Sequence, residues 1–166
     1  MTNTENKSFT PIKIRDLWQT PEPLFNNINK EFNFDFDVCA SHDNTLVNSY
    51  WTEDDNSLTQ DWGFRNWCNP PYSDIGPWVD KAIIEHTRRN TIVMLVPADT
   101  SVKWFKRAYD SCNEVRFISG RLSFINANTQ SPVNGNNKGS VIFVWRAYCA
   151  SHCISLMDRD ILMNSL

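Results

Sequence analysis

The chain has 166 residues, of which 41% are hydrophobic and 13% aromatic, and its formal net charge is −3 at pH 7. A chain of this size buries most of its apolar surface in one core, which predicts a single domain over residues 16–166, and the weak negative charge excludes a protein that binds polyanions through its overall charge. The five cysteines, an odd number without a Cys-x-x-Cys pair, exclude a disulfide framework and a zinc site, and no apolar run or leader pattern suggests a membrane span or secretion, so we expect a cytoplasmic protein without a metal.

The N-terminal part of the chain is predicted to hold an arm, a helix and a strand. Residues 1–15 lack hydrophobic periodicity, which predicts a flexible arm. Thr20 is a suitable N-cap residue with Pro21 in the first helical position, and helically spaced apolar residues predict that this helix continues to Phe32. Alternating apolar and acidic residues over 34–38 then predict a strand.

The middle of the chain alternates between strand and helix patterns. Residues 41–61 are polar and resist assignment, whereas Asn66-Trp67-Cys68 is predicted to form a brief strand. Pro77 opens a helix, and the apolar run over 91–96 predicts a strand buried on both faces. A further helix is predicted over 101–109, capped by Asp99, Thr100 or Ser101. The remaining expected elements are a strand over 114–118, a hairpin segment over 121–124, an exposed loop over 126–139 and a final strand over 141–145.

Strands that alternate with helices predict an α/β domain, in which a mostly parallel sheet has helices on both faces and an antiparallel final strand. Cys149, His152 and Cys153 follow that strand, and we interpret them as its tail because no second pair of metal ligands accompanies them. In such a sheet, ligands bind at the carboxyl ends of the strands. The residues that directly follow each strand are therefore the candidates for function.

Asn69-Pro70-Pro71-Tyr72 directly follows the strand predicted at 66–68 and suits chemistry on an aromatic amine. The lone pair of such an amine is delocalised into its ring, so a catalyst must favour the tetrahedral form. The Asn69 side-chain oxygen and the Pro70 carbonyl can each accept one amine hydrogen, while the consecutive prolines hold both acceptors in place. Tyr72 offers an aromatic face to a base rotated out of a duplex. The alternative interpretation is an ordinary Asn-Pro turn with Tyr72 in the core.

The tetrapeptide is similar to the catalytic motif of amino-group methyltransferases, and the chain from Trp18 to Trp145 resembles the phage-type DNA N-6-adenine methyltransferase (Dam) family. The other landmarks are Trp18-Gln19-Thr20-Pro21, Phe36-Asp37-Val38-Cys39-Ala40-Ser41, Gln60-Asp61-Trp62, Trp67-Cys68, Leu95-Val96-Pro97-Ala98, Lys103-Trp104-Phe105 and Phe117-Ile118-Ser119-Gly120-Arg121-Leu122-Ser123-Phe124. The resemblance implies a Rossmann-like methyltransferase fold, S-adenosyl-L-methionine as methyl donor and adenine N6 in double-stranded DNA as acceptor.

The resemblance also implies residues for the cofactor. Thr20 and Pro21 resemble the helix start that meets the methionine carboxylate of the cofactor, and Asp37 resembles the acid near its amino group. Cys39-Ala40-Ser41 forms the end of the same strand, with Ser41 where many methyltransferases have a glycine. A plain helix cap and an exposed strand acid are the alternative interpretations.

Two further acidic positions are candidates for the cofactor's nucleoside. The run Glu53-Asp54-Asp55, with Asp55 as our candidate, can supply a carboxylate to the ribose hydroxyls, although such runs are usually solvated and the sequence does not choose among the three. Asp61 matches the position that contacts the cofactor's adenine in similar enzymes, and Trp62 lies beside it. An acid that flanks a strand, with a tryptophan in the core, is the alternative.

Basic residues after the tetrapeptide are candidates for DNA contacts. Residues 81–166 carry 11 basic and 6 acidic side chains, against 5 basic and 13 acidic ones in residues 1–80. This asymmetry fits a site for a cationic ligand in the first part and a phosphate-facing surface in the second. Chance is the alternative explanation of the uneven charge. The loop over 126–139 is rich in Asn and Gly, and its amides can pair with adenine. The candidates for phosphate contacts are Lys103, Arg107, Arg121 and Lys138, with Arg121 ranked first and a solvated surface charge as the alternative for each.

Three functions are compatible with these motifs. The first is direct methyl transfer to adenine N6, without a metal and without a covalent enzyme intermediate. The second keeps the fold and changes the acceptor to a protein glutamine or an rRNA guanine, and the third is a non-catalytic DNA-binding module. The family suggests GATC as recognition sequence and the cytoplasm of a bacterial host as location, while the oligomeric state stays undetermined.

Overall fold

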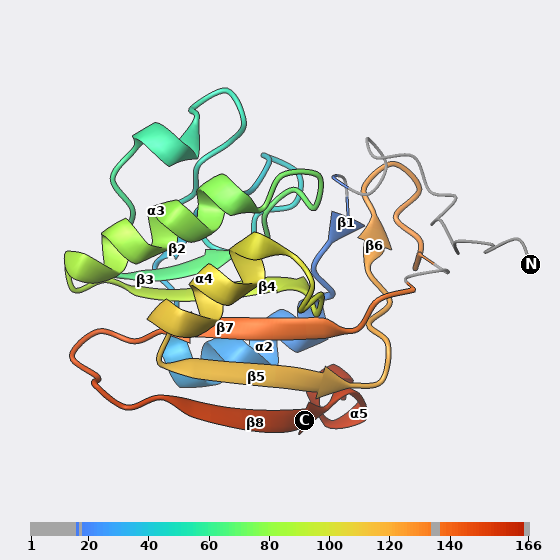
Figure 1. The fold of residues 1–166 in the computed structure, drawn as a ribbon. Coiled ribbons are helices and arrows are strands. Elements are labelled where there is room, and N and C mark those ends of the chain that lie inside the picture. Colours follow the sequence, from blue (N-terminus) through green and yellow to red (C-terminus); the bar gives the residue numbers. More distant parts are fainter. Residues whose placement is uncertain (1–15, 17, 134–136, 165–166) are drawn as a thin grey trace, which may run out of the picture.

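The computed structural model describes residues 16, 18–133 and 137–164, and a six-stranded sheet lies at its centre (Figure 1). The strand order is β2-β3-β4-β7-β5-β8. These strands are β2 (Phe36–Asp37), β3 (Arg65–Cys68), β4 (Thr91–Pro97), β5 (Glu114–Ser119), β7 (Ser140–Trp145) and β8 (Cys153–Asp158). The arm expected over residues 1–15 lies outside the described residues.

All strands of this sheet run parallel except β7, which lies between β4 and β5 and is antiparallel to both. β7 is the antiparallel strand expected at 141–145, so the mostly parallel α/β sheet is confirmed. It is not the last strand, because β8 follows and pairs in parallel with β5. The chain reverses between β7 and β8, where Tyr148 has a left-handed φ of 59°, and Cys153 therefore begins a new strand instead of ending β7.

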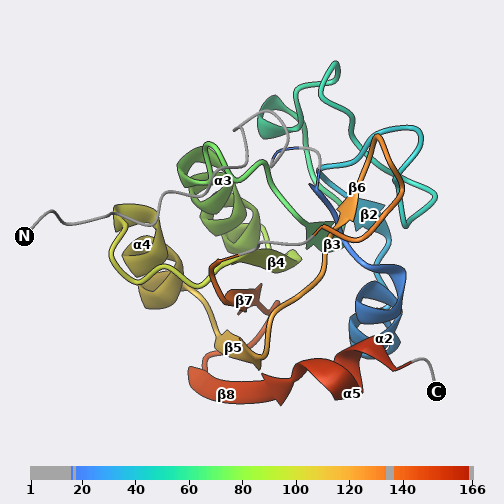
Figure 2. The same cartoon turned by 90° about the vertical axis from the view of Figure 1, so that its right-hand side faces the viewer.

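Helices cover both faces of the sheet, as Figure 2 shows in a view onto the carboxyl ends of the parallel strands. On one face, α3 (Gly76–Thr87) and α4 (Lys103–Ser111) pack against each other and against the sheet through one apolar cluster. On the other face, α2 (Glu22–Phe32) and α5 (Arg159–Met163) do the same through a second cluster. The strands of β4 and β7 are buried on both faces, which is why their sequences read as continuous apolar runs.

Two helix starts differ from the expected ones. α2 begins one residue later than expected, because the Pro21 carbonyl already accepts the first helical bond, from the N–H of Phe25 at 3.1 Å. Pro21 is therefore the N-cap, and Thr20 lies before it. α4 begins after Val102, and none of the three expected caps serves it. Asp99 instead accepts bonds from the N–H and the hydroxyl of Ser101, which closes a turn before the helix.

A second, two-stranded sheet lies beside the carboxyl ends of the main sheet. It pairs β1 (Trp18–Gln19) with β6 (Ile125–Asn126) in antiparallel register. The hairpin expected over 121–124 does not return along β5. After Gly120, whose φ is 90°, the chain leaves the main sheet and joins β1 instead. Of the loop expected over 126–139, residues 134–136 lie outside the described residues.

The segment between β2 and β3 has little regular structure. It contains the short 3-10 helix η1 (Ser57–Thr59) and one bridge between Asp37 and Tyr50. Its polar, aperiodic sequence resisted assignment for this reason. In Figure 1 this segment projects beyond the sheet near one end of α3 and forms a wall beside the carboxyl ends of β2 and β3.

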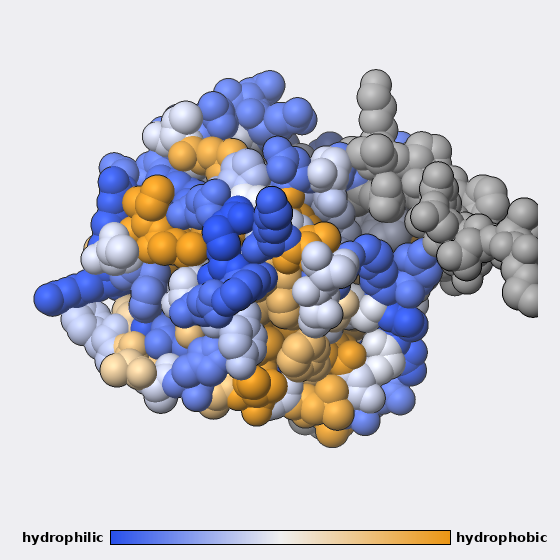
Figure 3. All heavy atoms as spheres, viewed as in Figure 1, coloured by the Kyte–Doolittle hydropathy of each residue, from blue (hydrophilic) through white to orange (hydrophobic). Residues whose placement is uncertain are grey.

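The outer edge of the sheet at β8 is apolar and exposed. Ile154 and Leu156 of β8 and Ile161 of α5 have more than half of their surface in contact with solvent. Figure 3 shows this apolar surface along the lower border of the molecule, where Figure 1 places β8 and α5. None of the helices in the described part of the chain has the length and apolar character needed to cross a lipid bilayer.

Candidate functional site

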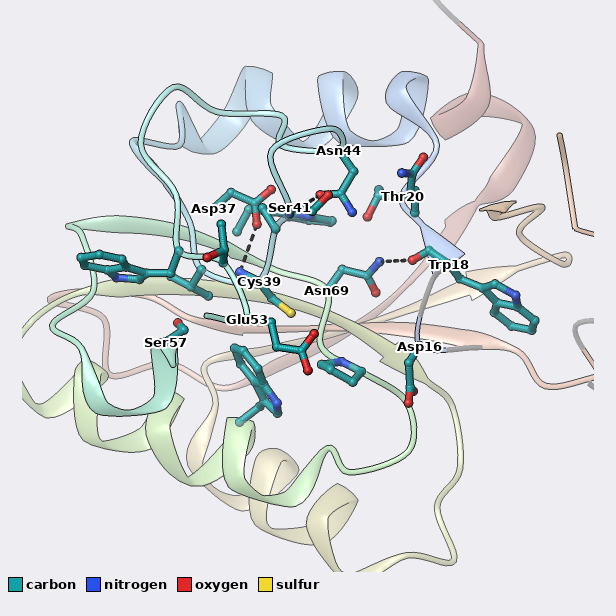
Figure 4. A pocket seen from close by; sticks show the side chains of 18 of the residues that line it. Asp16, Trp18, Thr20, Asp37, Cys39, Ser41, Asn44, Glu53, Ser57 and Asn69 are labelled. Atoms are coloured by element: carbon teal, nitrogen blue, oxygen red, sulfur yellow. Dashed lines mark hydrogen bonds between the residues drawn. The ribbon is translucent and has the colours of Figure 1, made fainter. Parts of the chain in front are cut away.

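A pocket of about 920 Å³ opens where β2 and β3 end (Figure 4). Strand β1 forms one side of it, the tetrapeptide and the start of α3 form the floor, and the irregular segment over 39–58 forms what we call the acidic wall. The lining side chains that carry polar or charged groups include Asp16, Thr20, Asp37, Cys39, Ser41, His42, Asn44, Glu53, Asp54, Ser57, Asn69, Ser73 and Asp74.

Asn69 lies in the middle of this pocket, directly after β3, and its amide is held in one orientation. Its Nδ2 donates a hydrogen bond of 3.2 Å to the carbonyl oxygen of Trp18. Its Oδ1 is buried and has no hydrogen-bond partner among the described residues. Buried acceptors are almost always paired in folded proteins, so this oxygen lacks a donor that a bound molecule can supply. The expected acceptor of the tetrapeptide is thus present and unsatisfied.

The other three residues of the tetrapeptide differ in their access to the pocket. Pro71 lines it, whereas Pro70 is buried and does not. Tyr72 also lies outside the lining, and its ring meets Trp18 and Phe124 edge-on, with centroids 6.3 and 5.8 Å away. Its hydroxyl is buried without a partner in the described part of the chain, and burial raises the pKa of this phenol above its ordinary value. Tyr72 therefore packs within an aromatic cluster at the border of the site.

Asp37, at the end of β2, is a buried carboxyl that lines the pocket. Only 4% of the residue is exposed, and burial raises the pKa of its carboxyl from an ordinary 3.8 to about 6. Backbone N–H groups of Cys39 and Leu46 oppose this effect, the first through a bond of 3.2 Å to Oδ1. A buried carboxylate of this kind is stabilised by any cation that enters the pocket.

Most of the remaining residues expected near the methionine part of a cofactor line the pocket, which leaves their role a prediction. Thr20, Cys39, Ala40 and Ser41 all line the pocket, whereas Pro21 is buried behind it. The N–H of Ser41 is already occupied by the Asn44 side chain, at 2.6 Å. The loop after β2 is thus closed by an asparagine side chain, in the place where many methyltransferases have glycines.

The acidic run is divided between the pocket and a turn. Glu53 and Asp54 line the pocket, but Asp55 does not. One carboxylate oxygen of Asp55 accepts bonds from the backbone N–H and the hydroxyl of Thr52, at 2.9 and 2.7 Å, and these bonds hold its pKa below the ordinary value. Asp55 therefore shapes the acidic wall, and Glu53 and Asp54 are the two carboxyl residues of the run that line the pocket.

Asp61 and Trp62 also lie outside the residues that line the pocket. The Asp61 side chain is 90% exposed and forms an ion pair of 2.6 Å with Arg88. Trp62 is buried, and its indole N–H donates to the carbonyl and the hydroxyl of Ser57, at 3.0 and 3.1 Å. Since Ser57 lines the pocket, Trp62 supports the acidic wall from behind.

The basic candidates for DNA contacts lie outside the pocket and differ in their partners. Arg107 pairs with Asp80 of α3 at 2.8 Å, and Lys138 pairs with Asp99, which holds the pKa of that carboxyl down at about 2. Lys103 and Arg121 are exposed. Arg121 follows β5 and approaches Gly139, so it lies with Lys138 at the same edge of the sheet as Asn69.

Sequence reasoning missed part of the site, in particular Asp16, Trp18 and the aromatic residues Trp51 and Trp78 that line it. The signal for Asp16 was its charge, because among the described residues five carboxyl residues and no lysine or arginine line the pocket. The five are Asp16, Asp37, Glu53, Asp54 and Asp74. Within the described part of the chain, no three such side chains are placed to share a metal ion. The carboxyl groups of the described lining favour a ligand that carries positive charge.

Comparison with known proteins gives this geometry a family. The model of the DNA N-6-adenine-methyltransferase (Dam) family matches residues 7–165. The DNA N-6-adenine-methyltransferase of Escherichia phage T1 is 37% identical over 155 residues, which cover 82% of this chain and 65% of that protein. The enzyme of the same name from Haemophilus phage HP1 is 39% identical over 144 residues, covering 84% of this chain and 83% of its own length.

A shorter match connects the chain with the putative methyltransferase YfdM of Escherichia coli K12, at 35% identity over 82 residues. The chain thus spans less than two thirds of the T1 protein and most of the HP1 protein. Because the family model matches nearly the whole sequence, the chain belongs to the DNA N-6-adenine-methyltransferase (Dam) family.

Proposed function

We propose that the protein transfers a methyl group from S-adenosyl-L-methionine to the exocyclic N6 of adenine in double-stranded DNA. The observation that carries this proposal is the buried, unpartnered Oδ1 of Asn69 in the middle of the pocket. Family membership supplies the reaction class and implies a methyl donor, and the relatives from phages T1 and HP1 are both named DNA N-6-adenine-methyltransferases. Because DNA is the proposed substrate, we also propose that the protein acts inside the cell that contains this DNA.

In the proposed reaction, Asn69 makes the amine a better nucleophile. Its Oδ1 accepts one N6 hydrogen, and the Pro70 carbonyl stays assigned to the other, although Pro70 does not line the pocket in this structure. Two acceptors localise the lone pair and stabilise the positive charge that develops on nitrogen. The methyl donor, when bound, supplies an electrophilic methyl group on a sulfonium. Because the methyl group passes directly to the amine, no covalent enzyme intermediate is needed. The spare proton of the amine then passes to water.

The acidic character of the pocket supports S-adenosyl-L-methionine as the donor. This molecule carries a sulfonium and an ammonium against one carboxylate, so its net charge is positive. Asp37 is the residue we assign to the ammonium, because an adjacent cation offsets the cost of ionising a buried carboxyl. Glu53 or Asp54, instead of Asp55, is assigned to the ribose hydroxyls. Thr20 remains assigned to the carboxylate of the cofactor's methionine part. Trp62 is proposed to support Ser57 and not to contact the cofactor.

Double-stranded DNA is proposed to approach along the carboxyl edge of the sheet. Arg121 and Lys138 lie together there, and the loop after β6 carries exposed Asn128 and Gln130. Phosphate contacts from the first pair position the duplex, and amide side chains can read an adenine. Lys103 and Arg107 lie on α4, where Arg107 pairs with Asp80 of α3, and both stay candidates for further phosphate contacts.

The test is methyl transfer with labelled cofactor and unmethylated DNA, followed by digestion to nucleosides. We expect label in N6-methyldeoxyadenosine alone. Asn69→Ala should abolish transfer while the cofactor still binds, and Asn26→Ala on the exposed face of α2 is the matched control that should retain activity. Label in another nucleoside, in rRNA or in protein would replace the acceptor that we propose, and an active Asn69→Ala variant would remove Asn69 from its role.

A further inference from the structure

Asp16 and Trp18 each form a hydrogen bond at one end of the tetrapeptide. The carbonyl oxygen of Trp18 accepts the bond from Asn69 Nδ2, and the Asp16 carboxylate accepts a bond of 3.0 Å from the backbone N–H of Ser73, directly after Tyr72. These partners lie 51 and 57 residues apart in sequence. The orientation of Asn69 is therefore decided by a segment that only the tertiary fold brings to it.

The Trp18 carbonyl is itself held in place by its side chain and by β6. The Trp18 residue is 9% exposed, and its indole stacks on Phe124 with centroids 5.6 Å apart and planes inclined by 17°. The same indole meets the ring of Tyr72 edge-on. In the β1–β6 ladder, Trp18 is the register partner of Asn126. Aromatic packing and strand pairing thus fix this carbonyl from two directions.

The carbonyl decides which end of the Asn69 amide faces the substrate. The oxygen and nitrogen of a side-chain amide have nearly the same size, so the group can present either end after a half-turn. A carbonyl oxygen only accepts hydrogen bonds, so it retains Nδ2 and turns Oδ1 away. In the reversed orientation two oxygens would face each other, and an N–H would meet the amine hydrogens of adenine.

We propose that Trp18 is a positioning residue of the reaction: its carbonyl orients the Asn69 amide, and its indole, packed between Tyr72 and Phe124, holds that carbonyl. The proposal rests on the function proposed above for Asn69. Trp18 does not touch the reacting atoms, and it acts through the acceptor that does. Its loss should therefore lower turnover more than it lowers binding of cofactor or DNA.

The first experiment varies the indole. Trp18→Ala removes the packing that holds the strand, and we expect kcat at saturating cofactor and DNA to fall on the order of 10- to 100-fold, as for a small displacement of a reacting group. Trp18→Phe keeps a ring against Phe124 and should recover most of this loss. Phe32→Ala removes a buried ring at the far end of α2 and should lower the melting temperature without lowering the kcat of the folded protein.

The second experiment removes the donor that the carbonyl selects. Asn69→Asp keeps the shape and one acceptor oxygen, but at neutral pH it loses the N–H and sets a carboxylate against the Trp18 carbonyl. We expect this variant to lose kcat nearly as completely as Asn69→Ala, while its affinity for S-adenosyl-L-methionine, measured by calorimetry, survives.

The outcomes separate this proposal from the proposed function. If Asn69→Ala is inactive while Asn69→Asp retains the wild-type kcat, the acceptor role stands and the orienting role of the Trp18 carbonyl is overturned. A Trp18→Ala variant that loses stability and keeps kcat overturns it as well. An active Asn69→Ala variant contradicts the proposed function itself.

Discussion

The tetrapeptide and the acidic wall face each other across one pocket, yet they are built in different ways. The tetrapeptide follows β3, whose Trp67 and Cys68 are fully buried in the sheet. The wall over residues 39–58 has one short 3-10 helix and is held by side-chain hydrogen bonds such as those of Asp55 and Trp62. The proposed catalytic residue thus follows a buried strand, whereas Glu53 and Asp54, two of the five carboxyl residues that line the pocket, lie on the side with less regular structure.

The largest expected effect concerns the rigid side. Trp67→Ala removes a ring that packs edge-on against Phe25, with centroids 5.5 Å apart, and against Phe34. We expect the free energy of unfolding in urea to fall by about 3–5 kcal/mol, as for other buried aromatic truncations. The comparison is Trp104→Ala on α4, where the tryptophan is only half-buried, and this variant should lower the free energy of unfolding clearly less. A loss below about 1 kcal/mol would contradict the view that β3 is the rigid support.

The next prediction concerns Asp37, where the two sides meet. Its pKa of about 6 in the folded state exceeds the ordinary 3.8, so the folded protein binds more protons than the unfolded chain between these values. The contribution of Asp37 therefore makes the free energy of unfolding fall as pH rises from about 4 to about 6, by about 3 kcal/mol, with no further change above that range.

Unfolding of the wild type and of Asp37→Asn, measured across this pH range without cofactor, checks this sign. The free energy of unfolding of the wild type, relative to that of Asp37→Asn, should fall as pH rises through this range. Saturating S-adenosyl-L-methionine should make this fall smaller, because its ammonium stabilises the carboxylate of Asp37. A slope of opposite sign, or the same slope in both proteins, would falsify the assignment of a buried, protonated Asp37.

A smaller effect is expected behind the acidic wall. Trp62→Phe keeps a ring and removes the N–H that holds Ser57, which should cost about 1–3 kcal/mol of stability through a lost buried hydrogen bond. It should also weaken cofactor binding while kcat at saturation stays close to that of the wild type. Trp104→Phe is the matched control. An unchanged dissociation constant would show that the wall keeps its shape without this bond.

The smallest predicted effect distinguishes two neighbouring carboxyl residues. Glu53→Gln removes a charge that lines the pocket, and we expect the dissociation constant of S-adenosyl-L-methionine to rise roughly tenfold, equivalent to about 1.4 kcal/mol. Asp55→Asn keeps an oxygen that can accept the bonds from Thr52, so the wall should keep its shape and this dissociation constant should change little. Calorimetric titration of both variants decides the case, and the reverse order would return the ribose contact to Asp55.

Elements with strong periodicity were predictable from the sequence, and so was the residue that follows them. The buried runs of β4 and β7, the apolar spacing of α2 and the position of Asn69 after β3 all follow from local patterns. The roles within the run Glu53-Asp54-Asp55 were not predictable from local patterns, because a turn closed by Thr52 and Asp55 decides which of the three residues lines the pocket. β8 was missed because its apolar residues lie on an exposed edge and not in the core.

What the sequence by itself determined is the α/β class, the tetrapeptide at the end of a strand and the likeness to a methyltransferase family. These are properties of local periodicity and of short motifs. Only the tertiary structure decided that Trp18 orients Asn69 and that Asp16 joins the pocket. It also decided that Asp55 and Trp62 support the pocket from outside, whereas the Asp61 side chain pairs with Arg88. The physical reason is that hydrogen bonds and ring contacts between residues about 50 positions apart depend on how strands β1 and β3 meet in space, which no local pattern records.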